Sequence, residues 1–510
     1  MNNVIEYLNY AASVYPDKMA FVDTNGGMTF SQLNISAKKI AMAIIHKTGG
    51  VVNQPIAVMM HKGKECIAAF MGIIYSGNYY SPIDTSMPEK RVNLIMKELS
   101  PVLVIAETAN TYVCENLCTY EKCMNQKAID EKMIEKQLSK VLNIDPVYVL
   151  FTSGSTGVPK GVVVSHAGVI DYTEWLKKTF HFDENTIFGN QAPLYFDNSI
   201  LDIYSCLKNG STVYFIEEKM FSFHGQLMRY LIEKRINTIF WVPSALIGVA
   251  DSNILEKIDE LPGLNNILFC GEVMPAKQLA KWMKKFEGAV FANLYGPTEI
   301  TDVCTYFIVD RIYGDNEILP IGKACENTEI LIINENGQYA EINETGEILV
   351  RGIGVSKGYY RNDEKSNAAF IQNPLHNDYR DIVYKTGDLG KIDENGNIIY
   401  IGRIDNQIKY QGHRIELGEI ESAANSISGV KRTCAVFSNK RNKIVLYVLT
   451  EELNEKEIYV LLKNKIPRYM LPAEIIILEE LPQNVNGKID RVRLKEDADT
   501  RSIEKNNRGN

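Results

Sequence analysis

Short apolar runs alternate with stretches of helical period through much of the chain. The apolar, β-prone runs lie at residues 55–59, 101–106, 211–216, 238–242 and 266–270, and residues 65–75 form one of the helical stretches. Strands that alternate with helices are typical of an α/β fold with largely parallel sheets. The pattern therefore predicts an α/β body built from more than one such unit.

The pattern changes after about residue 344. Short β-prone runs at 346–350, 390–392, 396–400 and 407–410 are separated by Gly and Asn, which predicts a small β-rich subdomain. Further on, helical runs at 416–427 and 455–465 mix with strand-like runs at 434–437, 443–449 and 474–478, as in an α+β unit. We predict a large N-terminal body of two α/β subdomains plus the β-rich subdomain at residues 1–403, a small C-terminal domain at 404–494 and a polar tail at 495–510.

The composition is that of an ordinary globular protein and excludes several classes. The net charge of −8 argues against nucleic acid as a partner, since no global basic field would hold a phosphate backbone. No run approaches the ~18 apolar residues of a membrane helix, so we expect no membrane insertion. The nine Cys, an odd number in a long chain without a signal-peptide pattern, indicate a reducing, cytoplasmic location.

The most informative segment is LFTSGSTGVPKGVVV at residues 150–164. Its glycines let backbone N–H groups approach an anion closely, and its hydroxyl groups add further donors. Lys160 adds a positive charge, so the loop suits the phosphates of ATP. It is not a Walker A loop, because Gly161 follows Lys160. The alternative, a flexible surface linker, is disfavoured because apolar strand-like runs flank the loop on both sides.

This segment and eight others, in the same order along the chain, resemble the motifs of adenylate-forming enzymes. The others are TFSQL (29–33), GNYYSPID (77–84), FDNS (196–199), NLYGPTE (293–299), GEILVRG (346–352), YKTGDL (384–389), GRIDNQIKYQGHRIELGEIE (402–421) and NGKIDR (486–491). The resemblance implies a reaction in two steps. A carboxylate first attacks the α-phosphorus of ATP, with Mg²⁺ as cofactor, and a thiol then displaces AMP to form a thioester.

The resemblance also implies roles for individual residues. Lys488 would bridge the substrate carboxylate and the α-phosphate, Glu299 would bind Mg²⁺, and Asp388 would hold the ribose hydroxyls. Each has a plain alternative: a surface lysine, a carboxylate at a helix start, and a turn aspartate. The resemblance implies that Lys488, Thr156 and Glu299 are the catalytic residues. The residues that it implies for ATP binding are Thr152, Ser153, Gly154, Ser155, Thr156, Gly157, Lys160, Gly271, Glu272, Asn293, Leu294, Tyr295, Gly296, Thr298, Asp388, Arg403 and Lys488.

In this family Tyr295 would stack on adenine and Asn293 would bond its amino edge, with a packed core tyrosine as the alternative for Tyr295. Arg403 would hold ribose or phosphate, or would be only a surface cation. Asp405 resembles the hinge about which the C-terminal domain rotates between the two steps. In the second state the loop at residues 411–413 would line a tunnel for the pantetheine arm.

Asp197 resembles the carboxylate that pairs with the α-ammonium group in amino-acid-activating members, the alternative being a cap on a helix that starts at Ser199. The matching pocket is mostly apolar and favours a small side chain. Besides Asp197 it consists of Asn198, Leu201, Phe240, Leu268, Cys270, Leu294, Asp302 and Val303. The segment LFCGEVMP at 268–275 is similar to D-alanine–carrier-protein ligases.

Asn198 and Asp302 depart from that pattern, because the D-alanine enzymes carry apolar residues at these places. A polar pair could serve a hydroxyl group or a second amine. D-alanine is therefore the leading candidate, and serine, proline, a short diamino acid or a β-amino acid stay open.

The chain shows no carrier-domain motif, so we expect the acceptor thiol to belong to a separate phosphopantetheinylated carrier protein. Two alternatives are kept. An acyl- or aryl-CoA ligase would share the first step and use coenzyme A. A non-catalytic nucleotide-binding module is disfavoured, because Lys488, Glu299, Asp388 and the phosphate loop are all present.

Overall fold

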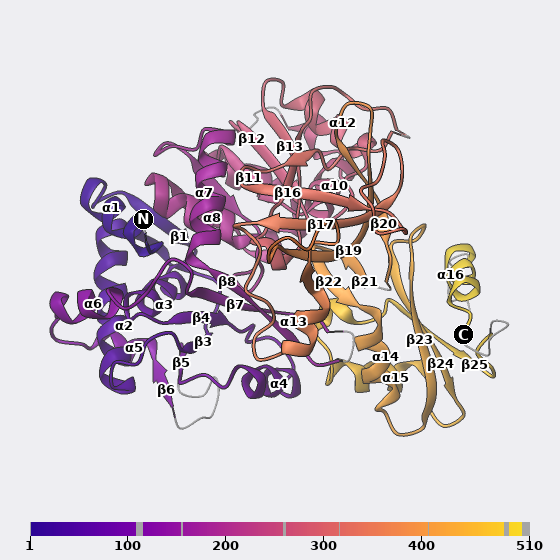
Figure 1. The fold of residues 1–510 in the computed structure, drawn as a ribbon, viewed down its shortest axis with the longest axis horizontal. Coiled ribbons are helices and arrows are strands. Elements are labelled where there is room, and N and C mark those ends of the chain that lie inside the picture. The colour runs from indigo at the N-terminus through magenta and orange to yellow at the C-terminus, as the bar shows by residue number, and fades with distance from the viewer. Residues whose placement is uncertain are drawn as a thin grey trace. The chain divides into compact units, whose positions relative to one another are not determined.

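The computed structural model describes residues 2–108, 116–154, 157–258, 262–315, 317–405, 407–483 and 489–501 (Figure 1). The chain forms two compact units. The first consists of Met1–Thr85, Leu99–Phe151 and Gly161–Ile404, and the second of Ser86–Glu98, Thr152–Lys160 and Asp405–Asn510. No helix among the described residues is long and apolar enough to cross a membrane.

The first unit begins with a six-stranded sheet in the order β6-β5-β3-β4-β7-β8. The strands are β3 (Pro55–Met59), β4 (Tyr79–Pro82), β5 (Leu103–Ala106), β6 (Leu117–Thr119), β7 (Pro146–Thr152) and β8 (Lys160–Ser165), and the β3–β4, β3–β5, β4–β7 and β5–β6 pairs are parallel. The neighbouring helices are α1 (Ile5–Val14), α2 (Phe30–Thr48), α3 (Lys64–Tyr75), α5 (Tyr120–Met124) and α6 (Glu131–Leu138). Helix α2 starts at a capping box in which Thr29 and Gln32 exchange hydrogen bonds of 2.9 and 3.2 Å.

A nine-stranded sheet in the order β15-β14-β13-β12-β11-β9-β10-β1-β2 carries the predicted site. Its strands are β1 (Met19–Asp23), β2 (Gly26–Thr29), β9 (Ile187–Asn190), β10 (Thr212–Phe215), β11 (Thr238–Trp241), β12 (Asn266–Cys270), β13 (Val290–Tyr295), β14 (Thr305–Ile308) and β15 (Lys323–Ala324). The run from β1 through β10, β9, β11 and β12 to β13 is parallel. Helices α7 (His166–Phe180), α8 (Ser199–Asn209), α9 (His224–Glu233), α10 (Pro243–Asp251), α11 (Ile254–Lys257) and α12 (Ala276–Lys285) connect the strands.

Alternation along these strands separates two cores. Ile239, Trp241, Ile267 and Phe269 point to one face, where they pack with buried residues of α9, α10 and α12. Phe240, Leu268, Cys270 and Leu294 lie in the other core, together with buried residues of α7 and α8. The strands are apolar on both faces because helices cover both, as expected for a parallel sheet.

An antiparallel sheet completes the first unit. It consists of β16 (Thr328–Ile333), β17 (Gly346–Gly352), β18 (Phe370–Gln372), β19 (Ile382–Ile392) and β20 (Ile398–Arg403), with α13 (Asp363–Ala369) beside it. The α/β fold class with a small β-rich subdomain, predicted from the sequence, is confirmed.

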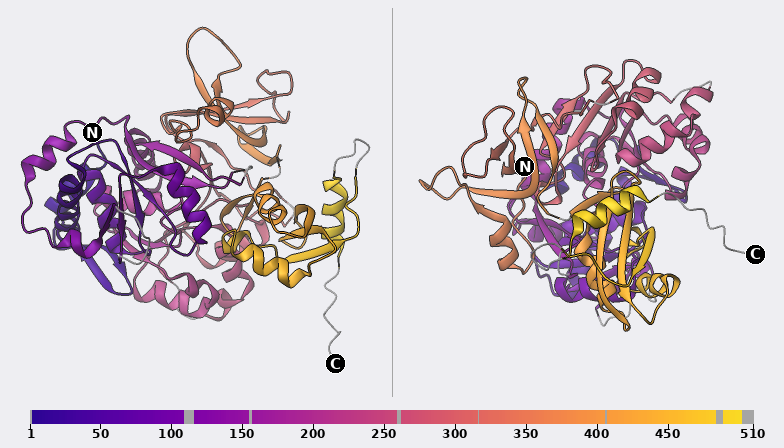
Figure 2. Two further views of the ribbon diagram at one scale, coloured as in Figure 1. Left: turned by 90° about the horizontal axis from the view of Figure 1, so that it is seen from below. Right: turned by 90° about the vertical axis from the view of Figure 1, so that its right-hand side faces the viewer.

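The second unit is α+β, as predicted. A hairpin of β21 (Gln407–Tyr410) and β22 (His413–Glu416) precedes a sheet of β23 (Val430–Ser438), β24 (Lys443–Thr450) and β25 (Glu474–Leu478). Helices α14 (Leu417–Asn425) and α15 (Glu455–Lys463) pack on one face of that sheet and α16 (Arg491–Thr500) packs on the other (Figures 1 and 2). The unit also contains α4 (Glu89–Leu99), except for its last residue.

Helix α16 runs past residue 495, where the sequence analysis begins the polar tail. Leu494 and Ala498, one helical turn apart, are 3 % and 0 % exposed and pack against Cys434 and Val436 of β23. Asp490 caps the helix by accepting from the backbone N–H of Arg493. These two apolar residues pack the helix on the sheet, and the Tyr447 hydroxyl on β24 adds a hydrogen bond to Asp497 Oδ2 over 2.6 Å.

Candidate active site

Strand register brings the apolar residues of the predicted substrate pocket together. Phe240 on β11 is paired with Leu268 on β12, and Cys270 on β12 with Leu294 on β13. Leu268 and Cys270 are two residues apart on β12, so their side chains point to the same side of the sheet. Both cross-strand pairs therefore face that side. Leu201 of α8 and Val303 belong to the same buried core. The six apolar members of the predicted pocket therefore share one core at the carboxyl ends of parallel strands, where α/β folds place their ligands.

Asp302 is buried in this region, and its carboxylate is held by a helix. The hydroxyl group of Tyr172 on α7 donates to Asp302 Oδ2 over 2.7 Å, and Asp302 is only 1 % exposed. Burial and the Asp302 charge raise the pKa of Tyr172 well above its ordinary value, so the phenol stays a donor. A Cβ on Gly296 would lie 2.2 Å from the Asp302 carbonyl oxygen. Glycine at 296 is therefore required for this close approach.

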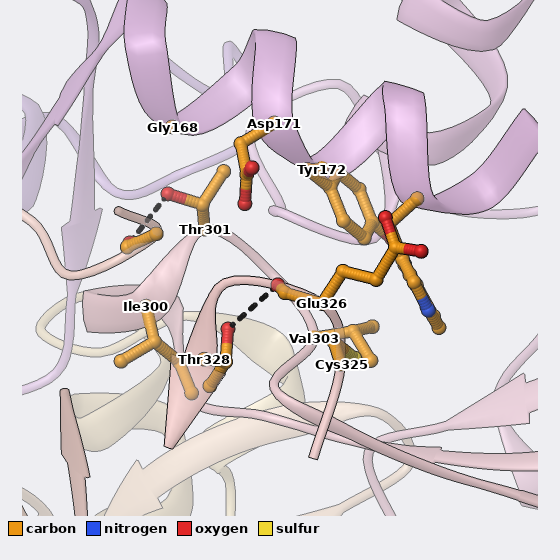
Figure 3. Close-up of a pocket in the computed structure, with 11 residues that line it drawn as sticks. Gly168, Asp171, Tyr172, Ile300, Thr301, Val303, Cys325, Glu326 and Thr328 are labelled. Atoms are coloured by element: carbon orange, nitrogen blue, oxygen red, sulfur yellow. Dashed lines mark hydrogen bonds between the residues drawn. The ribbon is translucent and has the colours of Figure 1, made fainter. Parts of the chain in front are cut away.

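A pocket between α7 and the segments at residues 300–303 and 325–328 adjoins the same region. Gly168, Asp171 and Tyr172 of the helix line it, opposite Ile300, Thr301, Val303, Cys325, Glu326 and Thr328 (Figure 3). It shares Tyr172 and Val303 with the residues described above. A Cβ on Gly168 would lie 2.8 Å from Thr301 Oγ1, so this glycine lets the helix approach the loop.

Asp197 and Asn198 lie at the start of α8. Asp197 Oδ1 accepts the backbone N–H of Asn198 over 3.0 Å, and the Asp197 carbonyl accepts that of Ile200 over 2.8 Å. Asn198 occupies the N-cap position, but its side chain makes no capping bond within the described part of the chain. Its Nδ2 is buried and has no hydrogen-bond partner among the described residues.

Three of the predicted adenosine-binding residues, Tyr295, Asp388 and Arg403, form one hydrogen-bonded cluster. Tyr295 donates its hydroxyl hydrogen to Asp388 Oδ2 over 2.6 Å, and Arg403 Nη1 donates to Asp388 Oδ1 over 2.7 Å. Asp388 is 2 % exposed. The burial of Tyr295 is the main cause that raises the pKa of its phenol well above the ordinary value, and the nearby Asp388 charge adds to this shift. Asn293 donates its Nδ2 to the Pro320 carbonyl over 2.8 Å, which leaves its Oδ1 as the atom available to a ligand amino group.

Glu299 follows Thr298 in a 3₁₀ turn, Thr298–Ile300, and is fully buried. Tyr359 donates to its Oε1 over 2.7 Å. A single carboxylate with one oxygen anchored in this way suits Mg²⁺, which takes one or two protein oxygens and completes its shell with phosphates and water. No group of three or more metal-binding side chains is found among the described residues.

Gly271 and Glu272 shape the loop that follows β12. Gly271 has a φ of 101°, a conformation that favours glycine. Glu272 Oε2 accepts the backbone N–H of Ser244 over 2.8 Å, at the start of α10. The loop next to Cys270 is thus tied to a helix N-terminus, where a carboxylate is favourable.

The described residues of the phosphate loop belong to the second unit. Ser153 Oγ donates to the Arg414 carbonyl over 2.8 Å, and Gly157 has a φ of 80°. Asp405 Oδ1 accepts the backbone N–H of Gln407 over 3.0 Å. Gly154 and Lys160 are described, whereas Ser155, Thr156 and Lys488 lie outside the described residues, so the predictions made for those three stay predictions.

Three tyrosines of this region were not identified from the sequence. Tyr172 and Tyr359 hold the carboxylates of Asp302 and Glu299. Tyr148 on β7 is fully buried, and the charges of Asp197 and Asp302 help to raise its pKa. Its hydroxyl has no hydrogen-bond partner in the part of the chain that the structure describes. Buried tyrosines in strands and helices resemble ordinary core residues, so only the fold shows that they adjoin the site.

Comparisons with known proteins agree with this architecture. The D-alanine–D-alanyl carrier protein ligase of Bacillus licheniformis is 32 % identical over 97 % of this chain and 99 % of its own length. Bacitracin synthase 1 of Bacillus licheniformis is also 32 % identical, over 96 % of this chain and 9 % of its own length. The Vibrio cholerae adenylation domain AlmE, solved with glycyl-adenosine-5'-phosphate, has the same fold, with a TM-score of 0.83 at 22 % identity over 98 % of both chains.

The profile of the family described as AMP-binding enzyme matches residues 8–360, and that of the AMP-binding enzyme C-terminal domain matches residues 419–488. The first match alone covers more than half of the chain. The chain therefore belongs to the AMP-binding enzyme family.

Proposed function

We propose that the protein is an amino acid–carrier-protein ligase. It activates the carboxylate of a small amino acid with ATP, forming aminoacyl-AMP and releasing pyrophosphate. It then transfers the aminoacyl group to the phosphopantetheine thiol of a separate carrier protein, forming a thioester and releasing AMP. The observation that carries the proposal is the row of Phe240, Leu268, Cys270 and Leu294 on one sheet face, next to the helix that begins just after Asp197.

The nucleotide is held by residues of the first unit. Asp388 offers carboxylate oxygens to the ribose hydroxyls in place of the bonds it now accepts from Tyr295 and Arg403. Asn293 Oδ1 accepts the adenine amino group. Glu299, oriented by the hydrogen bond from Tyr359, would hold Mg²⁺, which would neutralise charge on the phosphates.

In the first step an oxygen of the substrate carboxylate attacks the α-phosphorus, and the bond to pyrophosphate breaks. Both reactants are anions, so charge neutralisation and positioning dominate the barrier. Lys488 supplies the charge between carboxylate and α-phosphate, with Thr156 and the phosphate loop around the leaving pyrophosphate. In the second step the thiolate attacks the acyl carbon and AMP leaves.

The substrate ammonium pairs with Asp197, and the apolar row limits the side chain to a small one. D-alanine is the leading candidate, supported by relatives that carry the name D-alanine–D-alanyl carrier protein ligase. Serine, proline and short diamino acids are the other candidates.

We further propose that residues 1–403 form the adenylation core and residues 404–494 a mobile domain that turns about Asp405. A cytoplasmic location is supported by the free thiols of the described cysteines.

The test is amino-acid-dependent exchange of labelled pyrophosphate into ATP, followed by mass spectrometry of a phosphopantetheinylated carrier protein. We expect exchange with a small amino acid and loading of the carrier, both abolished by Lys488→Ala. Products with free coenzyme A from acids that lack an amine would instead identify an acyl- or aryl-CoA ligase. ATP binding without pyrophosphate formation from any acid would identify a non-catalytic binding module.

A further inference from the structure

Two cysteine thiols of the first unit face one another and belong to none of the predicted substrate or nucleotide sites. Cys123 Sγ donates to Cys118 Sγ over 3.3 Å, and both are free thiols. Cys118 is 4 % exposed and Cys123 is fully buried, so solvent reaches the pair through Cys118. The sulfurs of a disulfide lie about 2.05 Å apart, so these two need only a short approach to become bonded.

The contact follows from the way strand β6 passes into helix α5. Cys118 is the middle residue of β6, and α5 begins directly after the last residue of that strand, Thr119. Thr119 Oγ1 caps the helix by accepting the backbone N–H of Lys122 over 3.3 Å. Because no loop separates strand and helix, the first turn of α5 brings Cys123 back to Cys118. Parallel pairing with Ile105 of β5 holds Cys118 in the sheet.

The surroundings favour a thiolate at Cys118. The hydrogen bond from Cys123 is the main cause that lowers the pKa of Cys118 to about 7, and the charges of Lys47 and Lys122 add to it against the effect of burial. Lys47 of α2 is held at this place, since its Nζ donates to the Leu117 carbonyl over 2.8 Å. The same pairing and burial raise the pKa of Cys123, which therefore keeps its proton.

The remaining charged side chains here do not cancel this effect. Lys39 of α2 lies at the end of α5, where its Nζ donates to the Met124 carbonyl over 3.4 Å. Glu121, the acidic residue in the first turn of α5, is exposed to solvent. The cations therefore reach the backbone on both sides of the cysteine pair, whereas the carboxylate faces water.

Other buried cysteines of the chain differ from Cys118. Burial raises the pKa of Cys66, Cys206 and Cys434, so these thiols stay protonated. Cys206 Sγ donates to the carbonyls of Ala20 and Ser211 over 3.4 and 3.2 Å. A serine at this position can donate to the same carbonyls, which makes Cys206→Ser a suitable control.

We infer that Cys118 and Cys123 form an oxidisable dithiol, which hydrogen peroxide converts to an intramolecular disulfide. The Cys118 thiolate attacks one peroxide oxygen, the O–O bond breaks, and the leaving hydroxide takes up a proton to give water. Cys123 then attacks the sulfur of the resulting sulfenic acid, the S–O bond breaks, and the Cys123 proton leaves with hydroxide as a second water. Two thiols are oxidised and one peroxide is reduced. A thiol reductant restores the pair by exchange, which suits a transient disulfide in a reducing compartment.

The sequence allows this disulfide to be detected directly. Trypsin cleaves after Lys122, so the bond joins the peptides 98–122 and 123–127. The test treats the reduced full-length protein with hydrogen peroxide at pH 7, blocks the remaining thiols and maps the peptides by mass spectrometry. We expect the cross-link in the wild type and in Cys206→Ser, its loss in Cys118→Ser, and its reversal by dithiothreitol.

A second variant identifies the partner of Cys123. Cys114 lies in the same tryptic peptide as Cys118 and outside the described residues, so peptide masses alone do not distinguish the two. Cys114→Ser should keep the cross-link. Its loss in Cys114→Ser, or its persistence in Cys118→Ser, would overturn the inference.

The pH dependence gives a readout that needs no variant and so does not depend on how a variant folds. The rate of cross-linking should rise with a midpoint near pH 7 in the folded wild type and near the ordinary thiol value of about 8.5 in urea. Equal midpoints would show that closeness in the sequence is the only cause. That result would overturn the inference, as would sulfinic acid on Cys118 without a cross-link, or no reaction of the folded protein with peroxide.

Discussion

At the residue scale, Asp388 is the best-defined polar group of the site, because two donors orient its two oxygens. We predict that Asp388→Asn raises the KM for ATP at least tenfold and has a smaller effect on the KM for the amino acid. The amide keeps the shape but loses the charge that Arg403 neutralises at 2.7 Å, and it offers one acceptor oxygen in place of two. Initial rates of pyrophosphate exchange at varied ATP provide the measurement.

Asp381→Asn is the control for this change. Asp381 is also a partly buried carboxylate of the β-rich subdomain, paired with Arg351 over 2.6 Å, and the site does not include it. An equal rise in the KM for ATP in both variants would show that Asp388 acts only through the stability of the subdomain.

Gly296 has no side chain, and this lets the backbone of Asp302 pack closely against it. We predict that Gly296→Ala lowers the Tm by several degrees and reduces adenylation strongly, because the new Cβ would lie 2.2 Å from the Asp302 carbonyl oxygen and 2.8 Å from Val303 Cα. Gly263→Ala, where nothing lies within 4 Å of the added Cβ, should leave both unchanged. Calorimetry and exchange assays give the comparison, and a wild-type Tm for Gly296→Ala would contradict the steric argument.

At the element scale, the strands and their faces were predictable, and the polar partners were not. The family resemblance of the motifs placed Phe240, Leu268, Cys270 and Leu294 in one pocket, and the register of β11, β12 and β13 has them on one face. Tyr172 lies far from Asp302 in the sequence, on a helix whose other buried residues, such as Val169 and Leu176, pack in the core. Nothing local distinguishes it from a core tyrosine, because only the tertiary fold brings the two residues together.

A second buried polar cluster fixes the elements around Asp197. Lys62 Nζ donates to the carbonyls of Asn190, Gln191 and Ile216 over 3.1, 3.0 and 3.4 Å, at the ends of β9 and β10. Asn190 Nδ2 donates to Asp202 Oδ2 of α8 over 2.7 Å. Burial lowers the pKa of Lys62 from 10.5 to about 7 and raises that of Asp202 from 3.8 to about 7, and each charge opposes the shift of the other.

These shifts predict how stability depends on pH. Between pH 3.8 and 7 the folded state keeps a proton on Asp202 that the unfolded state has lost, so the free energy of unfolding falls as the pH rises. Between pH 7 and 10.5 the unfolded state keeps a proton on Lys62 that the folded state has lost, so the free energy rises again. The contribution of the pair is therefore lowest near pH 7. We expect Lys62→Met with Asp202→Asn to gain most in Tm, relative to wild type, at pH 7 and less at pH 5 and 9.

Lys64→Met with Asp23→Asn is the control pair. Lys64 Nζ donates to Asp23 Oδ1 over 2.8 Å. Burial alone would lower the pKa of Lys64, but this hydrogen bond and the neighbouring Glu65 carboxylate outweigh it and raise that pKa. Its charged form is stabilised by folding, so this double variant should lose Tm at all three pH values, with no maximum at pH 7. The same profile in both double variants would contradict the assignment to Lys62 and Asp202.

At the scale of the whole molecule, the two units divide the residues of the proposed reaction. The substrate and adenosine residues described here belong to the first unit, whereas the phosphate loop and Asp405 belong to the second. A residue that joins two units can affect one step of a reaction and not the other, if the units must change their relative orientation between steps. The proposed hinge at Asp405 makes this a prediction about two separate rates.

Asp405→Pro should leave pyrophosphate exchange within about threefold of wild type and lower the loading of the carrier protein at least tenfold. Proline fixes φ near −65° and so restricts the rotation that the second step needs. Asp405→Ala separates this effect from the loss of the side chain, because it removes the oxygen that accepts the Gln407 N–H over 3.0 Å and keeps the backbone free. Exchange and loading measured on the same preparations give the ratio of the two rates. If the proline variant loses both activities equally, or the alanine variant shows the same selective loss, rotation at this residue does not separate the two steps.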